Sequence, residues 1–325
     1  MAGAATRETF GETIVELADH FPHMVVLDAD LSKSTMTQAF AKKFPARHLE
    51  LGIAEQNMVG VGAGLALCGK IPVMTSFACF LTGRLEPIRV AVGYNSTNVK
   101  LVGTHAGLGI GEDGASQMGL EDVSAMRALP GMVILQPADA AETRQAVRWM
   151  LDHEGPVYLR LTRQKLDDCH GADYQFRMGR ADEVFGPPGG VARLLDGRSR
   201  LQATIFASGG TVPEAIRAGR ELENRGFRAR VMNAGTLHPF DGEAVVRAAK
   251  TSQRLVTVED HNVVGGLGSA VSECAAKDAL GVPVVTLGAR AFGESGLPAE
   301  LYEKFGISSA HIVDACLRNL DLPEN

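Results

Sequence analysis

The sequence predicts an α/β protein of two domains, each built on a mainly parallel sheet flanked by helices. Short runs rich in β-branched residues alternate with amphipathic stretches, a pattern typical of parallel sheets covered on both faces. A chain of 325 residues is long for a single hydrophobic core. The alternation lapses once near the middle of the chain, which indicates a boundary between two compact units.

The first series of elements fills the N-terminal half. An opening helix is indicated by an apolar face made of Phe10, Ile14, Leu17 and Phe21. A later helix is indicated by the run DAAE at 139–142, which reads as an N-cap followed by its capping glutamate. Five strands are expected, in runs that begin at Met24, Ile71, Asn98, Met132 and Pro156.

Strand pattern then lapses between about Lys165 and Arg200, where a GPPGG turn and mixed charge indicate an interdomain segment. A second series follows, with strands in ATIFASG, RARVMNAG, RLVTVED and PVVTLGAR and a helix opened by TVPE. We therefore predict one domain at 1–175, an interdomain segment at 176–200 and a second domain at 201–325.

Composition excludes several classes of protein. A net charge of −6 gives no reason to expect a nucleic acid or an anionic membrane as partner. The N-terminus lacks an apolar signal core, and no apolar run approaches the roughly 20 residues of a membrane helix. The five cysteines are scattered without a CxxC pair, which argues against a disulfide framework or a structural zinc site. We expect a cytoplasmic protein that holds no metal itself.

Six runs in one order resemble the transketolase family of thiamine-diphosphate enzymes. They are DADLSKST from Asp28, LGIAEQNM from Leu51, TSFACF from Thr75, THAGLGIGEDGASQ from Thr104, ALPGMVILQPADAAE from Ala128, and LRLTRQ ending at Gln164. The resemblance covers nearly the whole chain. It implies a pyrimidine-binding domain followed by a transketolase C-terminal domain.

Glu55 opens a helix of small residues in the run GIAEQNM. A lone glutamate at a helix start would be expected only to favour the positive end of the helix dipole. The resemblance instead implies that its carboxylate hydrogen-bonds the aminopyrimidine ring of thiamine diphosphate and shares a proton there. That proton sharing helps to activate the thiazolium carbon of the cofactor, so Glu55 is predicted to be both catalytic and cofactor-binding.

Three further residues are implied to contact the cofactor. Phe77 and Phe80 follow a predicted strand, where phenylalanines usually belong to the core. The resemblance implies that both wall the pyrimidine pocket, where a flat apolar face can stack on a heteroaromatic ring. Asp30 is expected to help shape the cofactor interface. Gly83 stands where many transketolases carry another aromatic residue, so the pocket is either wider or covered by Arg84.

The run from Thr104 to Gln117 is implied to face the substrate. A histidine at a strand end is often structural, and GEDG could be only a tight turn. By resemblance, His105 faces the substrate channel and contributes to catalysis, while Asp113 recognises a substrate hydroxyl. Gln117 stands where the family usually has a histidine. A glutamine can donate a hydrogen bond but cannot titrate, so the identity of the donor substrate is left open.

An anion-binding group is also implied. Arg7, Ser34 and Arg163 match family positions that hold a sugar phosphate together with His105. Two guanidinium groups and a hydroxyl can meet a phosphate through charge-assisted hydrogen bonds, although each arginine alone would be read as a surface residue. The glycines of VEDHNVVGGLGS and His261 match no nucleotide-binding spacing, and we expect them to be structural.

The sequence has no GDG run followed by asparagines, through which relatives hold Mg²⁺ and the diphosphate. The resemblance therefore implies the smaller subunit of a split transketolase. A separate N-terminal diphosphate-binding subunit is expected to hold the Mg²⁺, to share the thiamine diphosphate and to complete an α2β2 heterotetramer. This chain alone is expected to be inactive.

The predicted reaction is transfer of a two-carbon ketol unit from a ketose to an aldehyde acceptor, with sugars or sugar phosphates as substrates. The alternatives are the β subunit of a 2-oxo-acid dehydrogenase, an enzyme like deoxyxylulose-phosphate synthase, and a non-catalytic scaffold subunit. The THAG…GEDG run and the TRQ sequence favour transketolase.

Overall fold

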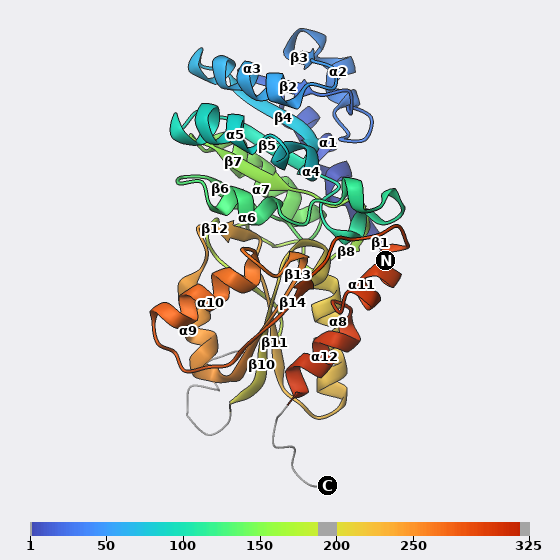
Figure 1. Cartoon of the computed structure of the whole chain (residues 1–325), viewed down its shortest axis with the longest axis vertical. Helices are drawn as coiled ribbons and strands as arrows, with labels where there is room; N and C mark the ends of the chain where they lie inside the picture. Colours follow the sequence, from blue (N-terminus) through green and yellow to red (C-terminus); the bar gives the residue numbers. More distant parts are fainter. Residues whose placement is uncertain (1, 188–199, 319–325) are drawn as a thin grey trace.

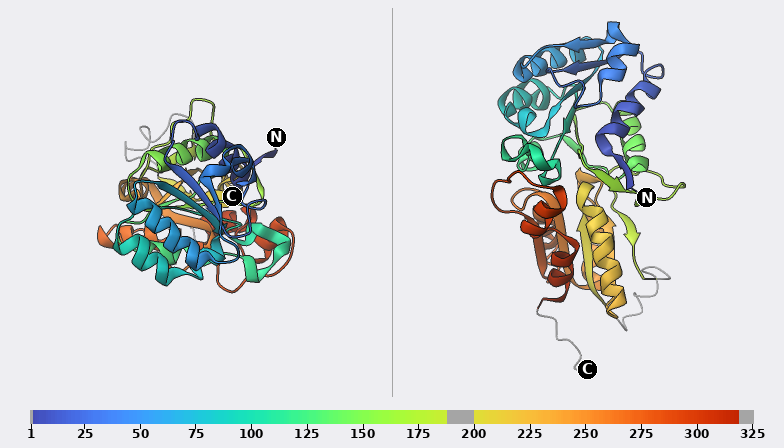
Figure 2. Two further views of the ribbon diagram at one scale, coloured as in Figure 1. Left: turned by 90° about the horizontal axis from the view of Figure 1, so that it is seen from above. Right: turned by 90° about the vertical axis from the view of Figure 1, so that its right-hand side faces the viewer.

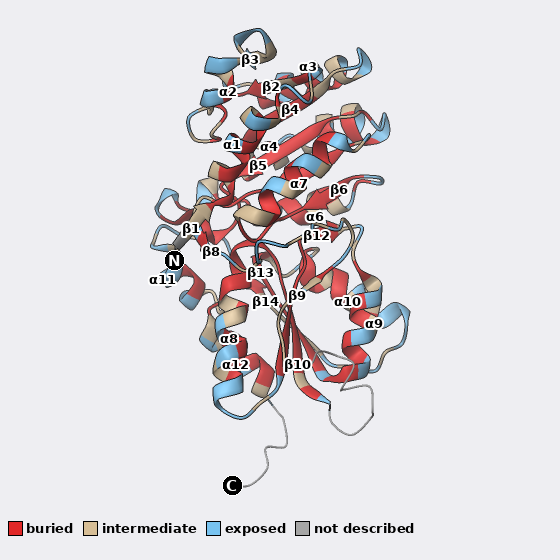
Figure 3. Cartoon of the chain, turned by 180° about the vertical axis from the view of Figure 1, so that it is seen from behind, coloured by how far each residue is buried: buried red, intermediate tan, exposed pale blue. Residues whose placement is uncertain are grey.

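The computed structural model describes residues 2–187 and 200–318. Two α/β domains stack end to end along the long axis of the molecule (Figures 1 and 2). The central strands of both sheets are buried, while the outer faces of the helices are exposed to solvent (Figure 3). The predicted fold class is confirmed, and each strand expected from the sequence is formed.

The first sheet is parallel except at one edge. Its order is β12-β6-β7-β5-β4-β2-β3, and only β12 runs antiparallel to its neighbour. The strands are β2 (Met24–Asp28), β3 (His48–Glu50), β4 (Ile71–Phe77), β5 (Lys100–Thr104), β6 (Val133–Leu135), β7 (Val157–Arg160) and β12 (Thr236–His238).

Helices cover both faces of this sheet. One buried cluster joins it to α1 (Thr6–Leu17), α2 (Gln38–Lys43) and α7 (Ala140–Asp152). A second cluster joins it to α3 (Glu55–Leu67), a π-helix at Ile88–Tyr94 and α6 (Asp122–Arg127). The short helices α4 (Ala78–Thr82) and α5 (Leu85–Pro87) follow β4. The carboxyl ends of β2, β4, β5 and β7 therefore meet at one edge, because these strands are parallel.

The second sheet has the order β14-β13-β10-β11-β9. Its strands are β9 (Asp182–Phe185), β10 (Leu201–Ala207), β11 (Ala229–Asn233), β13 (Ser252–Asn262) and β14 (Val284–Ala289). Its helices are α8 (Val212–Asn224), α9 (Gly242–Thr251), α10 (Leu267–Lys277), α11 (Pro298–Lys304) and α12 (Ser309–Leu317). Among the described helices, none combines the length and apolarity that crossing a membrane requires.

The expected lapse of strand structure between Lys165 and Arg200 is wrong in part. β8 (Lys165–Asp167) pairs with β1 (Ala2–Ala5), and β9 pairs antiparallel with β11 of the second sheet. Both strands are short, so they leave little periodic signal. Residues 188–199, including the end of the GPPGG turn, lie outside the described residues. The domain limits at 1–175, 176–200 and 201–325 stay predictions.

The two domains are interlocked by exchange of short segments. β12 comes from the second half of the chain but pairs with β6 of the first sheet. In the other direction, Leu108 and Ile110 of the first half pack in the core of the second domain. The interdomain contact is therefore part of both cores.

Asp260 on β13 is the main polar link between the domains. Its buried carboxylate accepts hydrogen bonds from the backbone N–H groups of Leu108, at 2.5 Å, and Gly109, at 2.9 Å. The Tyr302 hydroxyl donates to the same carboxylate at 2.8 Å and accepts from the Gln164 amide at 2.7 Å. This network fixes the loop that follows β5 against the second domain.

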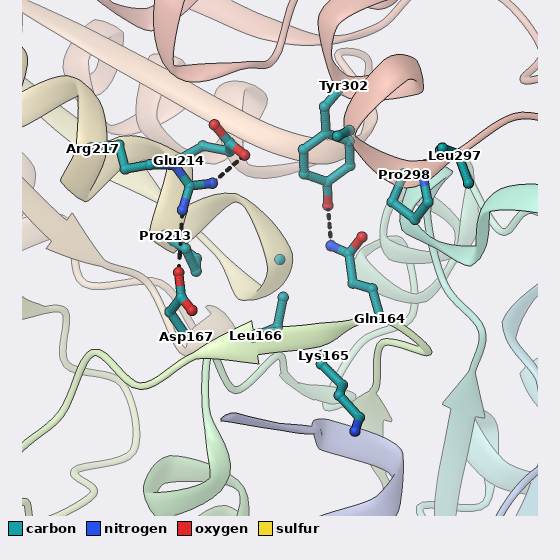
Figure 4. A pocket seen from close by; sticks show the side chains of 12 residues that line it. Gln164, Lys165, Leu166, Asp167, Pro213, Glu214, Arg217, Leu297, Pro298 and Tyr302 are labelled. Carbon is teal, nitrogen blue, oxygen red and sulfur yellow. Dashed lines mark hydrogen bonds and ion pairs between the residues drawn. The ribbon is translucent and has the colours of Figure 1, made fainter. Parts of the chain in front are cut away.

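Figure 4 shows the Gln164–Tyr302 contact at the wall of a pocket between β8, α8 and α11. The pocket has a volume of about 350 Å³. Arg217 extends between Asp167 and Glu214 and pairs with both carboxylates. Its guanidinium is therefore already engaged by groups of this chain.

We expect Tyr302→Phe to lower the free energy of unfolding by about 1–3 kcal/mol, because the buried Asp260 carboxylate and the Gln164 amide each lose a partner. Urea unfolding followed by circular dichroism measures the change. Tyr94→Phe is the matched control, since Tyr94 is 85% exposed and should change stability by less than about 0.5 kcal/mol. Equal stability of the two variants would contradict a stabilising role for the hydrogen-bond network around Asp260.

Candidate functional site

A groove of about 640 Å³ lies at the carboxyl ends of the first-sheet strands. We call it the basic groove because three cationic side chains line it. Its lining residues are Arg7, Leu31, Lys33, Ser34, Met36, Phe77, Phe80, His105, Asp113, Gln117 and Arg163. The structure thus brings together eight of the ten residues that the sequence predicted to be functional, and their roles remain to be tested.

The loop after β2 is shaped by the buried carboxylate of Asp28. That carboxylate accepts hydrogen bonds from the hydroxyls of Thr35, at 3.0 Å, Thr37, at 2.6 Å, and Thr75, at 2.5 Å. The contacts with Thr35 and Thr37 tie the C-terminal end of the run DLSKST to β2, from which the run follows directly. As a result, Lys33 and Ser34 are presented to the basic groove from a fixed turn.

Three rings form a continuous stack at the inner wall of the basic groove. The Phe77 ring lies 5.3 Å from that of Phe80 at an interplanar angle of 11°. The Phe77 ring also stacks on the His105 imidazole, with centroids 3.8 Å apart. Phe77 is buried while Phe80 is half-buried, so the outer ring offers an apolar surface to a ligand.

The His105 imidazole is held neutral. Arg7 donates to its Nε2 at 3.0 Å, and Thr104 Oγ1 lies 2.9 Å from its Nδ1. Because a guanidinium can only donate, Nε2 is the acceptor and the ring proton resides on Nδ1. Burial, followed by the charges of Arg7 and Arg163, lowers the pKa of His105 to about 3. His105 also adopts a positive φ of 56°, which turns the chain out of β5 into the loop.

The cations of the basic groove are oriented by backbone carbonyls. Arg7 donates to the Ser34 carbonyl and Arg163 donates to the Ile110 carbonyl, both at 2.8 Å. Burial and the neighbouring Arg163 lower the pKa of Arg7 from its ordinary value. The exposed Lys33 adds a third positive charge that the sequence analysis did not single out. Its only sequence signal is its place in the run DLSKST.

Glu55 is the first residue of α3 and is 4% exposed. Its contacts are loose: the Ser76 hydroxyl donates to Oε1 at 3.4 Å, and Arg84 lies 4.0 Å from Oε2. Arg84 thus lies near Glu55 but does not line the basic groove, so both sequence alternatives for the place of Gly83 stay predictions. Glu55 does not line the basic groove but is linked to its wall through Ser76, the neighbour of Phe77.

The placement of Asp30 gives no support to its predicted role at the cofactor interface. It is exposed, and its backbone N–H donates to the Glu50 carboxylate at 2.7 Å. It does not line the basic groove. Asp113 and Gln117 do line the groove, on two short 3₁₀ turns that follow β5.

The glycine-rich run near His261 has no room for an anion at the start of α10. The Glu259 carboxylate accepts hydrogen bonds from the N–H groups of Leu267, at 2.7 Å, and Gly268, at 2.8 Å. These are the amides that a phosphate would need. The expectation that this run is structural agrees with these contacts.

The residues around Glu55 fit an aminopyrimidine ring. A buried carboxylate with only long contacts to the described side chains has hydrogen-bonding capacity to spare. The adjacent aromatic wall supplies the apolar surface that a flat heteroaromatic ring requires.

Comparison with known proteins gives the family. Residues 2–168 match the transketolase pyrimidine-binding domain, and residues 192–312 match the transketolase C-terminal domain. The chain belongs to the transketolase family. It is thus a transferase-type chain with the pyrimidine-binding and C-terminal domains of thiamine-diphosphate enzymes, which favours the transketolase prediction over a 2-oxo-acid dehydrogenase subunit.

The similar proteins include subunits of split transketolases. A subunit of the 6-deoxy-6-sulfo-D-fructose transketolase of Clostridium sp. strain MSTE9 is 40% identical over 95% of this chain and 92% of its own. One subunit of the apulose-4-phosphate transketolase of Phocaeicola vulgatus is 37% identical over 86% of each chain. A solved split-gene transketolase, described as an inactive β4 tetramer, superposes with a TM-score of 0.85 at 41% identity, covering 99% of this chain and 100% of its own.

The depressed pKa of His105 predicts a pH dependence of stability. Between the ordinary histidine value of about 6.5 and the folded value of about 3, only the unfolded chain takes up this proton. The free energy of unfolding should therefore fall as the pH falls below about 6.5, by roughly 1–2 kcal/mol between pH 7 and pH 5. His105→Gln should remove that component, as measured by urea unfolding at each pH. If the free energies of unfolding of the wild type and the His105→Gln variant changed with pH in parallel, this prediction would be contradicted.

Proposed function

We propose that this chain is the small subunit of a two-component transketolase. The enzyme would move a two-carbon ketol unit from a ketose to an aldehyde acceptor, using thiamine diphosphate held between this chain and a partner subunit. The observation that carries the proposal is the buried, loosely bonded carboxyl group of Glu55 behind an aromatic wall that borders the basic groove.

Each part of the site has a task in this reaction. When bound, thiamine diphosphate supplies the nucleophilic carbon and accepts the electrons of the broken carbon–carbon bond. Glu55 would hold and return a proton at the edge of the pyrimidine ring, and burial keeps water from competing for that proton. Phe77 and Phe80 would orient the ring and exclude water from it.

The charge of the basic groove supports an anionic sugar as substrate. Arg7, Arg163 and Lys33 offer three cations, and among the groove-lining residues Asp113 is the one carboxylate. Two guanidiniums suit a phosphate or a sulfonate, both of which present several acceptor oxygens. The two split relatives named above are also named for a sulfo sugar and a sugar phosphate.

Gln117 limits how a proton could reach the substrate carbonyl group. Its side-chain amide can donate a hydrogen bond to the carbonyl oxygen but cannot supply a proton. His105 is neutral, and its Nε2 already accepts from Arg7, so it offers no proton to the substrate until that contact is displaced. Proton transfer near the reacting carbon would then depend on Glu55 acting on the cofactor.

The surface of α3 supports a partner subunit. A side chain added at the exposed Gly60 or Gly64 would meet no atom of residues 2–187 or 200–318 within 4 Å. Ile53 is 82% exposed and Leu67 is 75% exposed at the two ends of this helix. Small residues between exposed apolar ones permit a close helix contact. A diphosphate-binding subunit that carries Mg²⁺ would dock here, in an α2β2 assembly within the cytoplasm.

Reconstitution tests the proposed reaction. We expect ketose cleavage only when both purified subunits are mixed with thiamine diphosphate and Mg²⁺. Glu55→Gln should reduce turnover at least about 100-fold, because glutamine cannot share the proton. Glu223→Gln, on the exposed surface of α8, makes the same change of charge and should leave turnover unchanged. Full activity of the Glu55 variant would remove its assigned role.

The partner surface is tested by a size series at Gly64. Gly64→Leu should leave the fold of this chain intact, since the position is open, but should weaken association with the diphosphate-binding subunit at least about tenfold. Gly64→Ala is the matched control and should associate more tightly than the leucine variant. Analytical ultracentrifugation of the mixture measures both. Unchanged association of Gly64→Leu would place the partner elsewhere.

A further inference from the structure

Three potential metal ligands meet away from the basic groove, at the junction of the two domains. Asp139 caps the start of α7, while Cys169 and His170 follow β8 in the segment that leads to the second domain. Asp139 Oδ2 lies 2.9 Å from His170 Nδ1 and 3.3 Å from Cys169 Sγ. Cys169 Sγ lies 3.4 Å from His170 Nδ1, which closes the triangle.

We propose that Asp139, Cys169 and His170 form a binding site for a thiophilic divalent cation of the zinc class. The site is separate from the proposed reaction, because none of the three residues lines the basic groove. The cysteine pattern of the sequence argues against a structural zinc site, since no CxxC pair is present. The first two ligands come together here only through the fold, because they are 30 positions apart in the sequence.

The spacing of the three atoms suits tetrahedral coordination. Zinc binds sulfur at about 2.3 Å and nitrogen or oxygen at about 2.0–2.2 Å, so ligand atoms of a tetrahedral site lie about 3.3–3.6 Å apart. The observed separations of 2.9, 3.3 and 3.4 Å are shorter by only a few tenths of an ångström. An ion could therefore enter with small side-chain shifts, and a water molecule would fill the fourth position.

The ligand set also balances charge. A carboxylate and a thiolate together neutralise a dication, and a neutral imidazole adds a third bond. The Asp139 Oδ2 atom is already fixed by the backbone N–H groups of Cys169, at 3.0 Å, and His170, at 2.8 Å. The cation would displace the two side-chain protons that now point at this oxygen: the thiol proton is released to solvent, and the imidazole proton moves from Nδ1 to Nε2.

The surroundings of His170 supply the support that a metal-bound imidazole needs. The Tyr174 ring packs on the imidazole with centroids 3.9 Å apart. When Nδ1 binds a metal, Nε2 carries a proton and needs an acceptor. The fully buried Asn233 amide lies 3.4 Å from Nε2 through its Nδ2 atom, and its Oδ1 has no hydrogen-bond partner among the residues that the structure describes. Rotation of that amide would bring the spare oxygen to the Nε2 proton, in exchange for the hydrogen bond that Nδ2 now donates to the Glu142 carboxylate at 2.8 Å.

Occupancy of the site would tie three parts of the chain together. Asp139 belongs to the first domain, Cys169 and His170 to the connecting segment, and Asn233 to β11 of the second domain. Because the site is absent from an unfolded chain, a bound cation would stabilise the folded junction. We therefore expect the cation to be structural.

Cobalt binding tests the site with a readout independent of activity. Full-length protein carrying Cys68→Ser, which removes the exposed thiol, would be stripped with a chelator and titrated with Co²⁺. We expect one equivalent to produce thiolate charge-transfer absorption in the near ultraviolet and visible bands of tetrahedral Co²⁺. Added Zn²⁺ should abolish both signals by displacing the ion.

The matched variant carries Cys169→Ser in addition to Cys68→Ser. Serine keeps a hydrogen-bond donor of similar shape near Asp139. This double variant should lose the charge-transfer band and bind at least about tenfold more weakly, with unchanged far-ultraviolet circular dichroism. Zn²⁺ should raise the melting temperature of the Cys68→Ser protein but not of the double variant. Absence of the band from the Cys68→Ser protein, or its persistence without Cys169, would overturn the proposal.

Discussion

The buried carboxylate of Asp260 is the constraint on which the site depends. It lies in the second domain, yet it accepts two backbone N–H groups of the first-domain loop that follows β5. That loop continues into the turns that carry Asp113 and Gln117 to the basic groove. A buried carboxylate is stable only when its oxygens are satisfied, so the loop and the domain contact are held by the same bonds. The second domain thus contributes to the groove by fixing its wall, although none of its described residues lines the groove.

The electrostatics of the basic groove follow from its composition. Arg7, Arg163 and Lys33 attract an anion, and the same positive field, added to burial, keeps His105 neutral. An anion that drew Arg7 away from the imidazole would weaken that effect, so binding of the substrate and proton uptake by His105 are coupled. Glu55 does not line the basic groove, and the cation nearest to it is Arg84, 4.0 Å from Oε2, which is too long for a close ion pair. Such a loosely paired carboxyl group suits the proton exchange that we propose for Glu55.

The sequence predicted most strands and most residues of the basic groove. Most of the features that it did not predict depend on contacts between residues distant in the chain. Strands such as β2, β4 and β5 are long apolar runs, so local pattern predicted them and their carboxyl ends. β12 and β9 are short and depend on partners distant in the chain, so no local pattern revealed them. Lys33 resembles any exposed lysine until the Asp28 contacts fix its loop. The Asp139, Cys169 and His170 triangle likewise exists only after β8 has paired and the junction has closed.

The central claim is that the Glu55 carboxyl group contacts the pyrimidine edge of thiamine diphosphate at the seam between subunits. Nitrogen-15 NMR of labelled thiamine diphosphate in the reconstituted complex measures that contact at the atom concerned. We predict that the ring nitrogen opposite the amine shows the chemical shift of a hydrogen-bonded, partly protonated nitrogen with the wild-type subunit. With Glu55→Gln, the same nitrogen should return to the shift of the unprotonated ring. Identical shifts in the two complexes would contradict the claim.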